Sequence, residues 1–277
     1  MTSRLFRYGF GGGLVAGLLA VWILWVTCLR VSCATPSALA AKPGATRVET
    51  VSGVVKLPVQ IESLLQLPRD YDANPTKQYP LIVFLHGSGE RKSPVLDLKK
   101  FGPPRQAVLD DLPFIILSPH CPTGKWWTDA DMTIAVMEAL ETVCKTNRVD
   151  RDRIVLTGMS MGGFGAWNLA QQYPDTFAAL AVVCGSGNPY LMDRVATMPI
   201  SIYHGARDLN VPLHYAQQMA LALSRVGNTA RLNIFPHKKH AIWRMVYSDP
   251  ALYRWLGAQR LSDRTKKTLP ATKGLPK

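Results

Sequence analysis

A serine flanked by two glycines is the feature of this sequence that most directly suggests chemistry. Residues 158–162 read Gly-Met-Ser-Met-Gly, and they lie between a short apolar run, Ile154–Leu156, and an amphipathic stretch that begins at Gly162. A serine on a sharp turn between a strand and a helix exposes its hydroxyl, and the helix N-terminus favours developing negative charge. Side chains at Gly158 and Gly162 would collide with the neighbouring strand and helix. Ser160 is therefore predicted to be a nucleophile.

A serine nucleophile needs a general base and a group that orients this base. Asp208 follows the apolar run 200–203, and His237 and His240 follow the last apolar run. Either histidine could serve by position, and we favour His240 because the loop must leave its strand and return over Ser160. Asp208 would orient the imidazole of His240, although it could instead cap the following helix.

A histidine-glycine loop follows the strongest apolar run, 81–85. A backbone N–H of Gly87 or Ser88, together with the N–H of Met161 directly after the serine, could bind the oxyanion of a tetrahedral intermediate. We expect His86 to hold this loop rather than to react.

Three tryptophans fall near the predicted site. Trp126 and Trp127 follow the run 114–117, and Trp243 lies three residues after His240. Loops at this end of the domain line the substrate pocket in this kind of fold, so we expect these tryptophans to contact substrate; packing within the loops is the alternative.

The cysteines give little support to a metal site. None has CxxC spacing, and neither His237 nor His240 has a cysteine nearby. The chemistry predicted above uses only side chains and backbone groups, so we expect neither a metal nor an organic cofactor. Of the five cysteines, cleavage after Ala40 would leave Cys121, Cys144 and Cys184, an odd number, and we expect them to be buried and unpaired.

The candidate residues follow short apolar runs that alternate with amphipathic stretches. The runs are 81–85, 114–117, 154–156, 179–183, 200–203 and 232–235, and the predicted helices are 131–147, 162–172 and 213–226. Such alternation predicts one α/β domain, a mostly parallel sheet with helices on both faces, whose ligand site lies at the carboxyl ends of the strands. Residues 49–57 and 61–67 are predicted to form a leading antiparallel pair.

The charge is concentrated at the two ends of the chain. The net charge is +13, of which residues 1–47 and residues 260–277 contribute +5 each. The body between them is nearly balanced, so a nucleic-acid-binding face is not expected.

The N-terminus has the pattern of an export signal. Arg4 and Arg7 precede an uncharged run over 8–29, and Ala38-Leu39-Ala40 offers a cleavage site. The run is nearly long enough to span a bilayer, so an uncleaved anchor is the alternative. In either case we expect an exported domain, which would be periplasmic, secreted or held at the membrane. The predicted organisation is signal or anchor 1–40, linker 41–47, catalytic domain 48–260 and disordered basic tail 261–277.

Two segments carry a family resemblance. One segment resembles the opening of exported α/β-hydrolases of the carboxylesterase and prolyl-oligopeptidase-like predicted-peptidase group. It comprises residues 67–72, Leu-Pro-Arg-Asp-Tyr-Asp, and residues 79–91, which include Leu85-His86-Gly87-Ser88-Gly89-Glu90-Arg91. The ending from His240 to Leu256 is similar as well. Feruloyl-esterase-like and dienelactone-hydrolase-like proteins are relatives of this group. The resemblance implies a serine hydrolase with Ser160, Asp208 and His240 as its triad.

Three hypotheses about function follow. The first is a serine hydrolase that cleaves carboxylic esters, on small molecules or on polymers, through an acyl-enzyme. The second is a serine peptidase, although we expect no propeller domain like that of prolyl oligopeptidases, which argues against peptidase activity. The serine in place of a cysteine argues against dienelactone hydrolase activity. The third is a binding protein on a hydrolase fold that has lost turnover.

Overall fold

The computed structural model describes residues 58–265. The predictions for 1–57, which include the export signal or anchor and the linker, lie outside the described residues, as does the tail from residue 266. Over 58–265, no helix combines the length and the apolar character that crossing a membrane requires.

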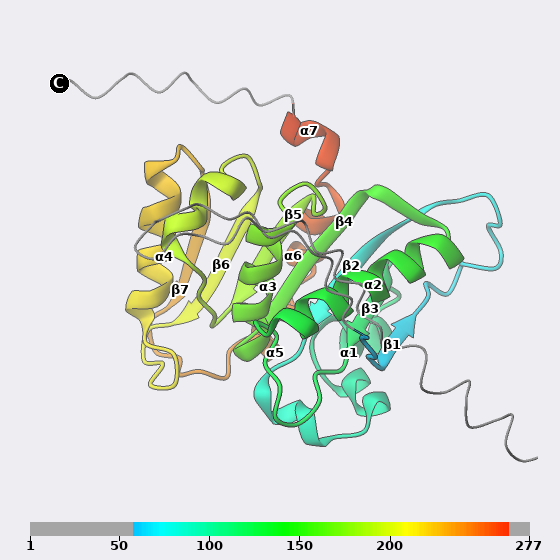
Figure 1. The fold of residues 1–277 in the computed structure, drawn as a ribbon, viewed down its shortest axis with the longest axis horizontal. Helices are drawn as coiled ribbons and strands as arrows, with labels where there is room; N and C mark the ends of the chain where they lie inside the picture. The colour runs from blue at the N-terminus through cyan, green and yellow to red at the C-terminus, as the bar shows by residue number, and fades with distance from the viewer. Residues whose placement is uncertain (1–57, 266–277) are drawn as a thin grey trace, which may run out of the picture. The chain divides into compact units, whose positions relative to one another are not determined.

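The described residues are built on a seven-stranded sheet with the order β1-β3-β2-β4-β5-β6-β7 (Figure 1). The strands are β1 Ser63–Gln66, β2 Tyr79–Leu85, β3 Ile115–Pro119, β4 Val149–Met159, β5 Ala179–Val183, β6 Ile200–Gly205 and β7 Arg231–Phe235. β1 is antiparallel to β3, and all other neighbours are parallel. Each of the six predicted apolar runs overlaps a strand, so the prediction of a mostly parallel sheet is confirmed.

Helices connect the strands and cover both faces of the sheet. The α-helices are α1 Gly102–Leu109, α2 Ala130–Thr146, α3 Met161–Gln172, α4 Leu213–Arg225, α5 Trp243–Tyr247, α6 Pro250–Gly257 and α7 Leu261–Thr265, and the 3₁₀ segments are η1 Ser88–Lys92, η2 Val95–Lys100 and η3 Pro189–Val195. The three predicted helices correspond to α2, α3 and α4. Helices α1 and α5 are too short to show a clear apolar period in the sequence.

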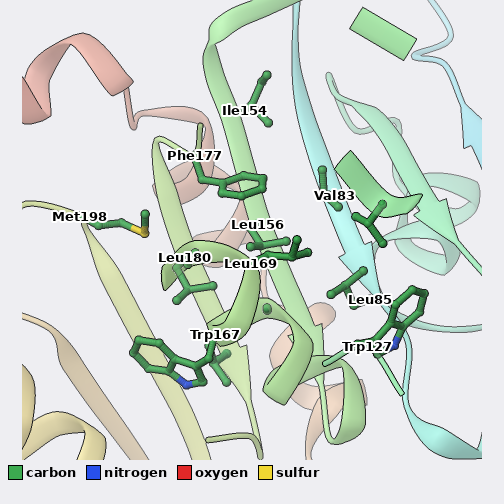
Figure 2. Packing of buried hydrophobic residues seen from close by; sticks show 14 of the residues in the cluster. Val83, Leu85, Trp127, Ile154, Leu156, Trp167, Leu169, Phe177, Leu180 and Met198 are labelled. Atoms are coloured by element: carbon green, nitrogen blue, oxygen red, sulfur yellow. The ribbon is translucent and has the colours of Figure 1, made fainter. Parts of the chain in front are cut away.

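Buried apolar side chains form one cluster on each face of the sheet. Along β2, Leu81, Val83 and Leu85 join one cluster, while Ile82 and Phe84 join the other, because successive strand residues point to opposite faces. Helices α2, α3 and α4 contribute to the first cluster, part of which is shown in Figure 2, and α5 and α6 contribute to the second. The sheet is therefore held rigidly between two apolar layers.

The first described strand lies at the edge of the sheet. Residues 63–66 pair with β3, with Leu65 opposite Leu117, and the predicted antiparallel partner of this segment, 49–57, lies outside the described residues. Pairing with β3 extends the edge of the main sheet, where the backbone groups of β3 would otherwise lack a partner.

The predicted tail begins too early. Residues 261–265 form α7, and the Arg264 guanidinium donates to the carbonyl of Pro174 at 2.6 Å and to that of Phe177. The Ser262 N–H donates to Asp152 at 2.7 Å. These polar anchors fix the helix to the body of the domain, and a search for apolar periodicity cannot detect such contacts.

Candidate active site

The candidate residues gather at the carboxyl edge of the sheet because the parallel strands all end there. The loops after β2, β4, β6 and β7 supply Ser88, Ser160, Asp208 and His240, respectively. This is the edge at which open α/β sheets bind their ligands.

Ser160 occupies a strained turn between β4 and α3. Its φ is 53° and its ψ is −120°, a conformation that non-glycine residues rarely adopt. The carbonyls of Gly162 and Leu85 lie where side chains at Gly158 and Gly162, respectively, would begin, so both positions require glycine, as predicted. The Ser160 N–H donates to the Val183 carbonyl at 2.8 Å, which helps to hold the turn against β5.

The three predicted triad side chains form one chain of hydrogen bonds. His240 Nε2 lies 2.8 Å from Ser160 Oγ, and His240 Nδ1 lies 2.7 Å from Asp208 Oδ2. His237 is exposed in the loop that leads to His240. The structure thus brings His240, and not His237, to the serine.

Asp208 is buried with both oxygens engaged. Its Oδ1 accepts hydrogen bonds from the N–H groups of Asn210 and Val211, both at 2.9 Å, while Oδ2 faces His240. Burial raises the pKa of Asp208, but the two amides and His240 outweigh burial and hold the pKa below its usual value. The carboxylate therefore stays ionised and fixes the imidazole. It is not a helix cap, because α4 begins only at Leu213.

His204 lies behind Asp208 and supports its loop. The ring is fully buried, and its Nε2 is 2.7 Å from the Val211 carbonyl and 3.4 Å from Asp208 Oδ2. Burial lowers the pKa of His204, which keeps the ring neutral.

His86 anchors the loop after β2. Its Nε2 accepts from the Cys121 N–H at 3.0 Å, so the ring proton must be on Nδ1, which donates to the Gly87 carbonyl at 2.7 Å. Burial lowers the pKa of His86 to about 4 and keeps the ring neutral. Since a trans peptide directs its C=O and N–H oppositely, anchoring the Gly87 carbonyl turns the Ser88 N–H away from His86. This favours Ser88 over Gly87 as an oxyanion donor.

The other candidate donor is the Met161 N–H at the start of α3. The N–H groups of Gly163 and Phe164, two and three residues further along, donate to the Ser160 carbonyl at 2.8 and 3.2 Å. The first N–H groups of a helix have no intrahelical acceptor, so that of Met161 can bind an anion beside the serine.

A cavity of about 560 Å³ opens over the serine, and we call it the Ser160 cavity. Ser88, Met161, Trp126 and Trp243 line it. Trp127 was predicted to line it too, but its side chain is buried, packs against α3 and donates from Nε1 to the His86 carbonyl at 2.9 Å. Its role is therefore to hold the oxyanion loop.

Sequence reasoning missed several residues of this cavity. Phe164, Asn210 and Val211 line it, and the four-residue spacing from Ser160 to Phe164 was the available signal for the first. Glu90 also lines it as a buried carboxyl, whose pKa burial raises, while Arg91 lies over the Trp126 ring.

One buried group in the described part of the chain could in principle hold a metal ion. The ligand atoms of Cys184, His204 and Asp208 lie within 4.8 Å of one another. Burial raises the pKa of Cys184 to about 12, which opposes the thiolate that a metal requires, and both Asp208 oxygens already have partners. These residues fit a support for the triad better than a metal site.

Part of the chain is similar to proteins of a known hydrolase family. Residues 122–253, which contain the Ser160 turn, Asp208 and His240, match the model of the dienelactone hydrolase family. An uncharacterized secreted protein of Arthroderma benhamiae is 25% identical over 229 residues, which are 66% of this chain and 24% of that protein.

Solved structures agree with the fold. A thermostable esterase is similar at 29% identity and a TM-score of 0.64, over 73% of this chain and 60% of that one. A puromycin-hydrolyzing peptidase of Mycobacterium tuberculosis is similar at 16% identity and a TM-score of 0.56, over 72% of this chain and 38% of that one. The chain thus spans less than two thirds of these relatives. It has the α/β-hydrolase fold, the predicted resemblance is confirmed, and the matches support an enzyme of the hydrolase class.

Proposed function

We propose that this α/β-hydrolase domain is a serine esterase that hydrolyses carboxylic esters through an acyl-enzyme. The observation that carries the proposal is the continuous chain from Ser160 through His240 to the buried, ionised Asp208, which ends in the Ser160 cavity. The similarity to a thermostable esterase points in the same direction.

The geometry suits acyl transfer. His240 Nε2 takes the proton of Ser160 as Oγ attacks the acyl carbon, and Asp208 stabilises the imidazolium that forms. The N–H groups of Ser88 and Met161 bind the oxygen that becomes negative. His240 then returns the proton to the departing alcohol, which leaves an acyl-Ser160 ester.

Water repeats the cycle on this ester. His240 deprotonates the water, the oxyanion again binds the two N–H groups, and collapse releases the acid with Ser160 restored. Every proton in both halves moves through His240, so these steps are complete with residues of this chain alone.

Labelling with a fluorophosphonate tests the nucleophile. Intact mass should increase by one adduct, and peptide analysis should locate it on Ser160; Ser160→Ala should remain unlabelled. Absence of an adduct on folded protein would contradict an activated serine and favour a binding protein on this fold.

A substrate comparison tests the bond that is cleaved. We expect hydrolysis of p-nitrophenyl butyrate, measured as nitrophenolate release, with kcat/KM far above that for peptide p-nitroanilides. Faster cleavage of the anilides would replace the esterase proposal by a peptidase.

We also propose that the domain is exported. Support comes from Arg4 and Arg7 before the uncharged run 8–29, and from the secreted relative of Arthroderma benhamiae. Fractionation of cells that express the full chain should locate it outside the cytoplasm; recovery in the cytosol would contradict export.

A further inference from the structure

A second cavity adjoins the Ser160 cavity on the side of α3, and we call it the amide groove. Its volume is about 330 Å³, and Phe164 lines both cavities. Its polar side chains are uncharged, from Thr128, Asn168, Gln172, Ser186 and Asn188 among others. No lysine, arginine, aspartate or glutamate of the described residues lines it.

The groove follows one face of α3 away from the nucleophile. Ser160, Phe164, Asn168 and Gln172 recur every four residues, and this spacing places them along one side of the helix. At 1.5 Å per residue, they lie about 6, 12 and 18 Å along the axis from the serine. A substrate whose ester is at Ser160 can therefore extend along this stripe.

Hydrogen bonds fix the walls of the groove. Gln172 Nε2 donates to Asn168 Oδ1 at 2.8 Å, and Asn168 Nδ2 donates to Thr133 Oγ1 at 3.0 Å. The facing loop is tied to α3, because the Gln171 amide exchanges bonds of 2.6 and 3.2 Å with the backbone of Asn188. Polar groups held in this way bind a ligand with little loss of side-chain entropy.

Three polar groups in the groove remain available. Within residues 58–265, no hydrogen bond joins Gln172 Oε1, Asn188 Nδ2 or the Ser186 hydroxyl to another protein group. Together they offer an acceptor, a donor and a group that can do both. Phe164 supplies an apolar surface next to them, and Tyr190, 89% exposed, follows Asn188 in the same loop.

This combination selects one kind of ligand. A charged group would find no opposite charge in the groove, and an alkyl chain would cover polar groups without satisfying them. A neutral ring that carries several hydroxyls would satisfy donors and acceptors together and would place C–H faces on the aromatic rings. We propose that the amide groove binds a neutral sugar unit, so that the preferred substrates are O-acyl esters of neutral sugars. This rests on the esterase function proposed above.

Matched esters test the specificity. Acid release from an acetylated trisaccharide of neutral sugars, which is long enough to extend from Ser160 to Gln172, and from ethyl acetate, which shares the acyl group, should give a kcat/KM ratio of about 10 or more in favour of the sugar ester. Gln172→Leu and Ser186→Ala should each lower that ratio about fivefold. Gln218→Leu, an exposed glutamine of α4 outside the groove, should leave it unchanged. A ratio near one in the unaltered protein, or equal ratios in all variants, would overturn the proposal.

Binding without turnover separates this proposal from the proposed function. Ser160→Ala should bind xylobiose in calorimetry, and adding Gln172→Leu should weaken the binding about fivefold. If Ser160 is not labelled by a fluorophosphonate while the sugar still binds, the groove assignment stands and the esterase fails. If the esterase is active but xylobiose does not bind, or a uronic acid disaccharide binds more tightly, the groove assignment is wrong.

Discussion

Two cavities of nearly equal volume lie at opposite edges of the sheet, and only one resembles an active site. The Ser160 cavity has about 560 Å³ at the carboxyl edge, and an amino-edge cavity has about 530 Å³ beside the starts of β2 and β4. Lys77 and Arg153 of the amino-edge cavity are paired with carboxylates at 2.7 and 2.6 Å. Cavity size therefore does not distinguish them; a serine hydroxyl bonded to an imidazole lines the Ser160 cavity, and neither a serine nor a histidine among residues 58–265 lines the amino-edge cavity.

Backbone strain is also confined to one edge. Among the described residues, the non-glycine residues with positive φ are Ser160, at 53°, and Cys184, at 50°, and both directly follow strands at the carboxyl edge. Strain of this kind persists where the surrounding structure holds it, and it is concentrated at functional sites. Helix α3 also begins at this edge, so its dipole favours negative charge beside the serine.

The largest effect on activity is expected from replacing Ser160, the proposed nucleophile. Ser160→Ala should lower kcat for p-nitrophenyl butyrate by about 10⁴-fold or more, because no other group completes the attack. Arg254→Ala in the amino-edge cavity should change it less than twofold. Substantial turnover by Ser160→Ala would show that chemistry does not depend on the carboxyl edge.

The next largest effect is expected at the acid. Asp208→Asn should lower kcat by about 10³- to 10⁴-fold with little change in KM, since the amide stabilises the wrong tautomer of His240. Asp110→Asn at the amino edge is the matched control and should be near neutral. A change confined to KM would indicate that another acid orients His240.

The glycines at the two edges offer a comparison of stability. Gly162→Ala should lower the free energy of unfolding by about 3 kcal/mol, because a side chain there overlaps the Leu85 carbonyl. At Gly257, in the amino-edge cavity, the nearest atom to an added Cβ is 3.2 Å away at the tip of the Phe114 ring, and Ala should cost less than about 1 kcal/mol. Urea unfolding measures both, and equal costs would contradict a tightly packed turn.

A pH-dependent effect of similar size tests the role of His86. Its pKa is about 4 in the folded protein and about 6.5 when unfolded, so the unfolded chain binds more protons between these values. The contribution of His86 to the free energy of unfolding is therefore fully present above pH 6.5. It declines as the pH falls toward 4, by about 3 kcal/mol in total. Urea unfolding at pH 7.5 and 4.5 should show this loss, and His86→Asn should reduce it. An unchanged pH dependence in the variant would show that His86 titrates normally.

Much of the site could be predicted because its chemistry is local in the sequence. The pattern around Ser160 is a strand, two glycines and a helix, and each part has a steric reason that neighbouring residues supply. Strands β2, β3 and β5 could be predicted because they are buried on both faces, and such strands are rich in consecutive apolar residues. Asp208 and His240 follow from the rule that the carboxyl ends of parallel strands share one edge.

What could not be predicted depended on contacts between distant segments. Trp126 and Trp127 are adjacent and chemically identical, yet one lines the Ser160 cavity and the other is buried against α3. In the same way, Arg264 is fixed by carbonyls about ninety residues earlier in the chain. Neither outcome has a local signature.

The sequence by itself determined the turn that presents Ser160, the order of Ser160, Asp208 and His240 along the chain, and the parallel sheet, because glycine sterics and apolar runs act over a few residues. Only the tertiary structure favours Ser88 over Gly87 as an N–H donor, since His86, Cys121 and Trp127 must meet to fix the peptide between them. Only the tertiary structure could also show that the uncharged groups of α3 and of the loop after β5 face one groove. Packing between residues that are far apart in the sequence sets the direction of these side chains, and local sequence patterns do not predict that direction.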